Sequence, residues 1–349
     1  MSTPVIAFFN NKGGVGKTTL AYHLAWMFSD LGLPTLAVDL DPQANLSSAF
    51  LDEDQFEALF EREPSAEPAT LYAALRPLVE GFGDVQVPEM VAAADSLWLL
   101  PGDLLLSTFE DQLSETWPKC SNGDIRAFRV TSAFWRVMQA AAAKIRAELV
   151  LLDLGPNLGA INRAGLISSD YVAVPLAPDL FSLQGLRNLG PRLRAWRDDW
   201  KDKLRKFPIG SLALPAGSMQ PAGYVVQQHA LRLDRPVKAY GRWMNRIPSE
   251  YCESVLGTAL QNSLTVANDP NCLATLKNHR SLMPLAQEAR KPMFHLRAGD
   301  GALGSHATAA LDAYDDYKRL ACQVAHRCSI ALPGPSQQEL LSTGVPGRP

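Results

Sequence analysis

The stretch that most constrains this chain is a glycine-rich loop between an apolar run and a helical pattern. Residues 4–10 read "PVIAFFN", residues 11–16 read "NKGGVG", and residues 17–31 carry apolar side chains at helical spacing up to Gly32. A short apolar run is typical of a buried strand, and a glycine after a helical pattern is typical of a helix C-terminus. Strand, glycine loop and helix in this order let successive backbone N–H groups surround a phosphate.

The loop nearly fits the phosphate-binding pattern G-x-x-x-x-G-K-[ST] but departs from it at one end. Gly16, Lys17 and Thr18 occupy the expected places, whereas Asn11 stands where the first glycine is expected and Lys12 follows it. We expect Lys17 to neutralise the β- and γ-phosphates of a nucleotide and the Thr18 hydroxyl to bind Mg²⁺. The alternative is a glycine turn before an ordinary helix, which the lysine, the threonine and the flanking strand disfavour.

Carboxylates follow two further apolar runs. Asp153 ends "LVLLD", in the form of a Walker B aspartate that holds Mg²⁺ through water, while Asp39 and Asp41 end "LAVDLD". The carboxyl ends of parallel strands form the ligand-binding edge of such a sheet. An aspartate of the second run can therefore orient a water molecule for attack on the γ-phosphate. The alternative is that these aspartates only cap the turns that follow them.

The order of the apolar runs predicts an α/β fold, with a mostly parallel, twisted sheet flanked by helices, as in P-loop NTPases. Helical periodicity is clearest over residues 131–147 and 307–327. The expected strands cover residues 4–10, 34–41, 96–102, 148–156, 170–178 and 222–228.

The organisation of the chain favours a single domain. Its 349 residues could build one large α/β domain or two smaller ones, and no linker divides them convincingly. We expect one domain over residues 1–329, with an acidic surface insertion near 51–68 and another insertion near 190–250. Residues 330–349 are rich in proline, glycine and serine, and we expect a flexible tail there.

Charge and cysteine content restrict the possible partners. The net charge of −3 provides no global attraction to nucleic acid or an anionic membrane, so such binding needs a local patch. No targeting sequence or long apolar run is evident, which predicts a soluble, cytoplasmic protein. The cysteines are scattered without metal-ligand spacing and are expected to be idle thiols: Cys120, Cys252, Cys272, Cys322 and Cys328.

Four motifs in sequence order resemble those of the ParA/Soj/MinD ATPases, the deviant Walker A branch of the P-loop proteins. The wording of the second motif is closest to the ParA-type partition proteins. Residues 97–113, "LWLLPGDLLLSTFEDQL", also resemble a strand and a glutamate-bearing helix of that group. The four motifs are "KGGVGKTT" (12–19), "VDLDPQANLS" (38–47), "LLDLGPNLG" (151–159) and "VPLAPDLFSLQGL" (174–186).

This resemblance implies ATP and Mg²⁺ as cofactors and a homodimer in the ATP state. Lys12 would reach across a nucleotide-sandwich dimer to the partner's phosphates, which couples weak, partner-stimulated ATP hydrolysis to dimerisation; the alternative is a solvated loop lysine. Asp41 would orient the attacking water and lie near the metal with Thr18 and Asp153. The nucleotide would also contact Gly13, Gly14, Val15, Gly16, Lys17, Thr19 and, through the similar segment 284–294, Pro284.

The position of the base is less defined. The family prefers adenine, and in MinD-like relatives a strand near the base ends in asparagine. Here the corresponding run ends "VVQQH", so Gln227 or Gln228 is only a weak candidate for base contact.

The resemblance further implies partition of plasmid or chromosomal DNA, with a ParB-like centromere-binding partner and non-specific DNA binding on the nucleoid. Such binding needs local positive charge. Two clusters offer it, although a basic helix with interleaved acids is more simply a solvated helix face. They comprise Arg187, Arg192, Arg194, Arg197, Lys201, Lys203, Arg205 and Lys206, then Arg232, Arg235, Lys238, Arg242 and Arg246.

Other functions within the family stay open to different degrees. A related ATPase that positions another cargo or a protein assembly is the main alternative. MinD-like membrane docking needs a basic amphipathic C-terminal helix, whereas residues 330–349 hold four prolines and Arg348 as their only basic residue. An iron–sulfur reductase would need a cysteine soon after Asp153, and the first is Cys252. The wording of the second motif disfavours the amide-forming synthetases.

Overall fold

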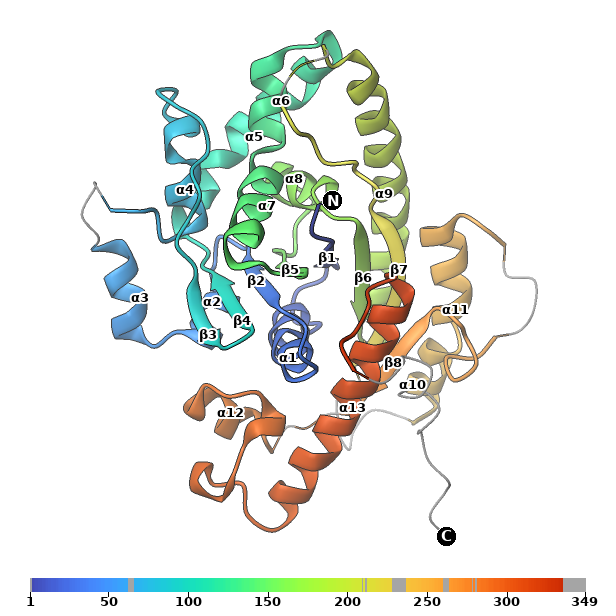
Figure 1. Cartoon of the computed structure of the whole chain (residues 1–349). Coiled ribbons are helices and arrows are strands. Elements are labelled where there is room, and N and C mark those ends of the chain that lie inside the picture. The colour runs from blue at the N-terminus through green and yellow to red at the C-terminus, as the bar shows by residue number, and fades with distance from the viewer. Residues whose placement is uncertain are drawn as a thin grey trace.

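The computed structural model describes residues 2–61, 66–208, 210, 212–227, 237–259, 264–277, 279 and 281–334. In this part of the chain, eight strands form one sheet in the order β3-β4-β2-β5-β1-β6-β7-β8, with helices on both faces (Figure 1). Every neighbouring pair is parallel except β3–β4. The strands are β1 (Val5–Phe8), β2 (Thr35–Asp39), β3 (Val91–Ala94), β4 (Leu97–Leu100), β5 (Leu149–Asp153), β6 (Tyr171–Leu176), β7 (Gln220–Gln227) and β8 (Cys272–Leu276).

The helices that cover this sheet account for most of the remaining described chain. The α-helices are α1 (Lys17–Asp30), α2 (Asn45–Phe50), α3 (Glu53–Phe60), α4 (Leu71–Val79), α5 (Phe109–Lys119), α6 (Ile125–Thr131), α7 (Ala133–Ile145), α8 (Ala160–Ile167), α9 (Leu180–Lys206), α10 (Val237–Met244), α11 (Ile247–Glu250), α12 (Met283–Ala289) and α13 (Ser305–Arg327). Short 3₁₀ segments are η1 (Leu104–Thr108), η2 (Cys120–Asn122), η4 (Met293–His295) and η5 (Ala298–Asp300), and η3 (Tyr251–Leu256) is a π-helix.

The mostly parallel α/β architecture confirms the fold expected from the apolar runs, and all six expected strands are present. The two strands that were not expected, β3 and β8, lie at the edges of the sheet. Their sequences are short ("VAAA" and "CLATL"), and each is only partly buried. An edge strand has fewer neighbours to cover it, so its apolar pattern is weaker than that of a central strand.

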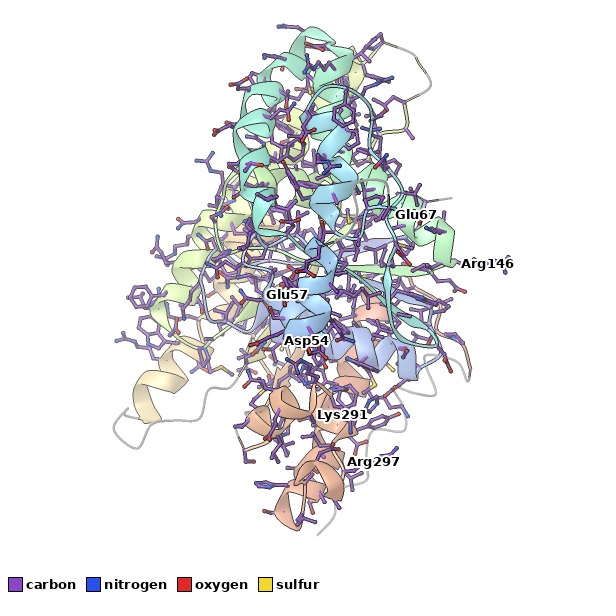
Figure 2. All side chains as sticks on the ribbon, turned by 90° about the vertical axis from the view of Figure 1, so that its left-hand side faces the viewer. Asp54, Glu57, Glu67, Arg146, Lys291 and Arg297 are labelled. Carbon is purple, nitrogen blue, oxygen red and sulfur yellow. The ribbon has the colours of Figure 1, made fainter. Side chains whose placement is uncertain are left out.

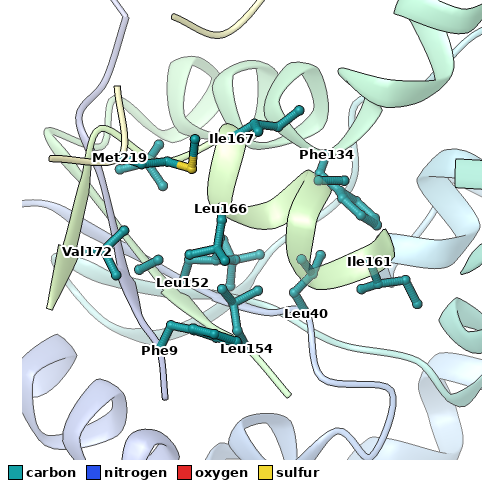
Figure 3. Packing of buried hydrophobic residues seen from close by; sticks show 14 of the residues in the cluster. Phe9, Leu40, Phe134, Leu152, Leu154, Ile161, Leu166, Ile167, Val172 and Met219 are labelled. Carbon is teal, nitrogen blue, oxygen red and sulfur yellow. The ribbon is translucent and has the colours of Figure 1, made fainter. Parts of the chain in front are cut away.

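Alternate residues of the central strands build two cores. Val5 and Ala7 of β1 face the side covered by α4–α9, whereas Ile6 and Phe8 face α1, α2, α12 and α13. Figure 3 shows part of the first core. Burial on both faces explains why the central strands read as continuous apolar runs rather than as alternating ones.

The helix expected over residues 131–147 corresponds to α7, and a separate helix, α6, ends directly before it. α6 ends at Thr131 and α7 begins at Ala133, with the buried Ser132 between them donating its hydroxyl to the Phe128 carbonyl at 2.7 Å. The local hydrogen bond competes with a continuous helix, as short polar side chains commonly do. The second expected helix, 307–327, corresponds to α13.

The two expected insertions contain regular elements. Residues 53–60 form α3, which begins with a capping box between Asp52 and Gln55, and Asp54 and Glu57 project from it toward solvent (Figure 2). The region 190–250 holds most of α9, then β7, α10 and α11. In the expected tail, Ile330 is buried against the second core, and residues 335–349 lie outside the described part of the chain.

Candidate nucleotide-binding site

The glycine loop leaves β1 and opens α1, as its sequence predicts. Gly14 and Gly16 have φ angles of 71° and 79°, a backbone conformation that side chains other than glycine rarely adopt. Gly16 is the N-cap residue of α1 and has no side-chain cap. A Cβ atom built on Gly13 or Gly14 would meet nothing within 4 Å. The loop therefore presents open space beside the first-turn N–H groups of α1, which have no partner inside the helix, and this geometry accepts a phosphate.

Lys17 lies in this loop with its side chain turned into the protein. The residue is only 8% exposed, and burial lowers the pKa of its ammonium group, while Asp153 and Asp41 act in the opposite direction. A partly desolvated cation beside two carboxylates interacts strongly with any additional anion because water screens it poorly.

Asp153 is the most unusual group of the site. It is fully buried at the end of β5, and neither carboxylate oxygen makes a hydrogen bond of normal geometry within the described chain. Burial and the nearby Asp39 raise its pKa to about 8, whereas Thr18 and Lys17 act to lower it. A buried carboxylate without a partner is costly unless a cation binds it. With the Thr18 hydroxyl close by, the donor set fits Mg²⁺, which prefers oxygen ligands and keeps several waters.

The two aspartates that follow the second apolar run have different environments. Asp39 accepts hydrogen bonds from the Ser47 N–H at 2.8 Å and the Ser47 hydroxyl at 2.7 Å. Burial nevertheless raises its pKa to about 6. Asp41 accepts the Gln43 N–H and lies beside Gly155, where a Cβ atom would be 3.2 Å from its Oδ1. Asp39 therefore holds the α2 segment, and Asp41 is the carboxylate left to act on a ligand.

Lys12 is already engaged within its own chain. Its ammonium group forms an ion pair with Asp179, the residue that caps α9 by accepting the Ser182 N–H. Burial would raise the pKa of Asp179, but Lys12 and Ser182 outweigh it and hold that pKa below its usual range. Asp179 was not among the residues proposed from the sequence, although it lies shortly after β6, at the edge of the sheet where Asp153 ends β5, and that position was the available signal.

α9 approaches the phosphate loop closely because it carries a glycine at the contact. A Cβ atom on Gly185 would lie 2.7 Å from Asn10 Oδ1 and 2.9 Å from Asn11 Oδ1. Asn10 also donates to the Pro175 carbonyl and accepts the Lys12 N–H. The start of the loop is therefore fixed against β6 and α9 through Asn10, whereas the buried Oδ1 of Asn11 makes no hydrogen bond within the described chain.

The residues proposed to lie near the base have different surroundings. Gln227 donates from Nε2 to the Gly16 carbonyl at 3.0 Å, so it supports the loop, and Gln228 lies outside the described residues. Pro284 is exposed at the start of α12. Its neighbours Met283 and Ala286 line a cavity of about 360 Å³ with Thr18 and Thr19, which brings α12 near the phosphate loop.

The first basic cluster lies on α9, and half of its cations are committed to intramolecular contacts. Lys203 is 3% exposed, contacts Asp199 and Ser121 at 2.5 and 3.0 Å, and lies over the Trp117 ring. Arg187 pairs with Glu250. Arg194 and Arg197 donate to main-chain carbonyls of residues 254–255 and 218–219.

The remaining cations of α9 are exposed. Arg205 pairs with Asp202 at the surface, and no ion pair within the described chain involves Arg192, Lys201 or Lys206. Of the second cluster, Arg242 and Arg246 lie over the Trp243 ring. Arg232 and Arg235 lie outside the described residues, and only the backbone of Lys238 is described. On α9, the exposed cationic surface is therefore smaller than the sequence suggests.

None of the helices in the described part of the chain combines the length and the apolar character needed to cross a bilayer.

The sheet order, with β1 between β5 and β6, and the loop that joins β1 to α1 define a P-loop NTPase with a second lysine in its phosphate loop.

Comparison with known proteins identifies the family. The profile of the AAA_31 family, described as an AAA domain, matches residues 3–206, and the chain belongs to this family, among P-loop ATPases of the ParA type. The chromosome partitioning protein ParA of Caulobacter vibrioides is 30% identical over 189 residues, covering 53% of this chain and 60% of that protein. A putative replication protein A of Rhizobium rhizogenes is 32% identical over 189 residues, covering 52% and 42%. The chain thus spans less than two thirds of either relative.

Solved structures match nearly the whole chain. Protein DIP2308 from Corynebacterium diphtheriae has a TM-score of 0.64 at 25% identity and covers 93% of this chain and 98% of its own. A variant of the McdA protein of Cyanothece in complex with ATP has a TM-score of 0.59 at 16% identity, with 95% and 98% covered. At that identity the second match shows the shared fold alone.

Proposed function

We propose that this protein is an ATP-dependent dimeric switch that hydrolyses ATP slowly and serves DNA partition. The observation that carries the proposal is the buried carboxylate of Asp153, which makes no normal hydrogen bond to any described residue and lies near Lys17 and Thr18. Such an arrangement is expensive in the absence of a ligand and suits a bound Mg²⁺–nucleotide.

In this proposal each residue has a distinct role. The N–H groups of residues 13–19 and the Lys17 ammonium bind the phosphates, and Thr18 and Asp153 hold Mg²⁺. When bound, the metal ion neutralises charge on the phosphate oxygens. Asp41 accepts a hydrogen bond from a water molecule and orients it toward the γ-phosphate. Asp39 does not take part, because Ser47 occupies its carboxylate.

In the proposed dimer, Lys12 contacts the phosphates of the nucleotide that is bound to the partner subunit. Reaching a partner's phosphates requires that it leave Asp179, so a nucleotide on the second subunit would compete with this intrachain ion pair. Large apolar side chains lie exposed beside the same edge of the sheet, among them Leu104 (66% exposed), Leu105 (51%) and Phe181 (70%). A second copy that covers them would remove apolar surface from water, which supports association at this face.

DNA partition with a ParB-like partner is the function that its ParA-type relatives favour. Exposed Arg192, Lys201 and Lys206 supply the cations that non-specific DNA binding would need. The commitment of Lys203, Arg187, Arg194 and Arg197 to internal contacts supports the alternative, a related ATPase that positions a protein assembly.

The experiment that separates these functions is DNA binding with ATP, with ADP and without nucleotide, each across a salt series. ATP-dependent, salt-sensitive binding is expected for partition, because phosphate contacts release counterions. DNA binding that is absent in all three states would exclude partition through non-specific DNA contacts and leave the protein-cargo function. ATP binding itself, measured by calorimetry with Mg²⁺, tests the nucleotide site separately.

A further inference from the structure

Glu110, in the first turn of α5, binds the first turn of α8, the helix that follows the Asp153 loop. Its Oε1 accepts the N–H of Ala160 at 2.5 Å and its Oε2 accepts the N–H of Ile161 at 2.8 Å. These N–H groups have no partner inside their own helix, and a carboxylate at a helix N-terminus also interacts favourably with the helix dipole. Both carboxylate oxygens therefore serve one contact between segments 50 residues apart.

The surrounding residues show that this contact is built closely. A Cβ atom on Gly159 would lie 2.5 Å from Glu110 Oε1, so a larger residue there would displace the carboxylate. One turn further along α8, Arg163 lies over the Trp117 ring of α5, 4.4 Å from its centre. It also donates to the Leu113 carbonyl at 3.4 Å. α5 and α8 are thus joined at two successive turns.

The anchored end of α8 controls a short loop that faces the candidate catalytic carboxylate. Residues 154–159 connect Asp153 to α8, and within them Gly155 lies against Asp41. Asn162 of α8 donates to the carbonyls of Gly155 and Asn157 at 3.0 and 2.7 Å. Leu154 at the start of the loop and Ile161 in the first turn of α8 pack in the same core (Figure 3).

We propose that Glu110 is a positioning residue for ATP hydrolysis. By holding the Ala160 and Ile161 N–H groups it fixes α8, and through Asn162 it fixes the placement of Gly155 beside Asp41. Glu110 does not contact the phosphate loop, so it acts on the reaction and not on nucleotide binding. This inference rests on the proposed ATP hydrolysis and assigns a role to the glutamate of the 97–113 segment.

The test compares Glu110→Ala and Glu110→Gln with Asp111→Ala, a matched control that removes an exposed acid from the same helical turn. Steady-state hydrolysis gives kcat, calorimetry gives ATP affinity, and amide exchange reports residues 154–161 in the nucleotide-free protein. Glu110→Ala is expected to lower kcat by about tenfold or more, because small displacements of reacting groups are costly, with unchanged ATP affinity and faster exchange. Glu110→Gln keeps an acceptor oxygen and should fall between Glu110→Ala and the wild type.

Two results would overturn the proposal. Unchanged kcat in Glu110→Ala would show that the anchor does not reach the reaction. Equal losses of affinity and kcat would show a merely structural role. If the wild-type protein bound ATP without hydrolysing it, the proposed function would fail instead. Amide exchange alone would then test whether Glu110 fixes α8. Exchange at residues 154–161 of Glu110→Ala that is as slow as in the wild type would contradict this role of Glu110.

Discussion

Two regions of this molecule carry dense charge, the phosphate-loop edge of the sheet and the long helix α9, and their charges are used in opposite ways. At the sheet edge, Asp153 is buried and makes no normal hydrogen bond within the part of the chain that the structure describes, and Lys17 is buried beside it. On α9, Lys203 is equally buried but has Asp199, Ser121 and the Trp117 ring as partners. Burial of a charged group alone therefore does not indicate a ligand site, whereas a buried carboxylate with no hydrogen-bond partner on either oxygen marks a candidate site.

The largest effect on turnover is expected from removing Lys12, the phosphate-loop lysine that we propose acts across a dimer. Lys12→Ala is expected to spare ATP binding and lower kcat by about a thousandfold, the scale at which a cation supplied in trans stabilises phosphoryl transfer. Asp179→Asn is the matched variant, because it breaks the intrachain ion pair yet keeps both Lys12 and an α9 cap. Normal hydrolysis by Lys12→Ala would refute a role in trans.

The second lysine should act on binding. Lys17→Ala is expected to weaken ATP affinity by about a hundredfold, because it removes charge-assisted hydrogen bonds worth about 1.5–3 kcal/mol each. Titration calorimetry with Mg²⁺–ATP measures the change. An affinity within the error of the wild type would mean that the nucleotide does not lie on this loop.

The uncompensated carboxylate should be visible in the pH dependence of stability. The folded-state pKa of Asp153 is raised to about 8, so folding favours its protonated form. The stability of the nucleotide-free protein should fall as the pH rises from about 4 through 8. Asp153→Asn is expected to flatten this fall and to raise the melting temperature at about pH 8.5, while it impairs Mg²⁺ binding. Parallel curves for the variant and the wild type would contradict this.

The smallest effects should come from the exposed cations of α9. Changing Arg192, Lys201 and Lys206 together to alanine should leave stability unchanged and reduce the salt slope of DNA binding by about three units if all three contact phosphates. Lys203→Ala is the contrasting variant. It should cost about 1–3 kcal/mol of stability, because it removes a buried side chain that packs over Trp117 and donates to Asp199 and Ser121. If folded Lys203→Ala selectively lost DNA binding, Lys203 would be a DNA-contacting residue and not a structural one.

The sequence predicts the centre of this molecule better than its periphery, for physical reasons. Strands buried on both faces must be apolar, so β1, β2, β5 and β6 are evident as runs, and phosphate geometry demands glycines and a lysine in fixed order. Edge strands such as β3 and β8 are not buried on both faces and so need not be continuously apolar. The partners of a charge come from distant segments of the chain. The sequence of residues 187–206 does not reveal that Lys203 lies over the Trp117 ring, and the sequence around Lys12 does not reveal its ion pair with Asp179.

α9 also has a mechanical consequence. Its 27 residues form one element through Pro191, so it extends about 40 Å at about 1.5 Å per residue. Asp179 at its start holds the phosphate-loop lysine, and Lys206 lies at its far end. If the helix moves as a rigid rod, a tilt of about 5° at its start displaces its far end by about 3.5 Å. Breaking the Lys12–Asp179 ion pair would thus move the surface around Lys206, which lies much farther away than any side chain can reach.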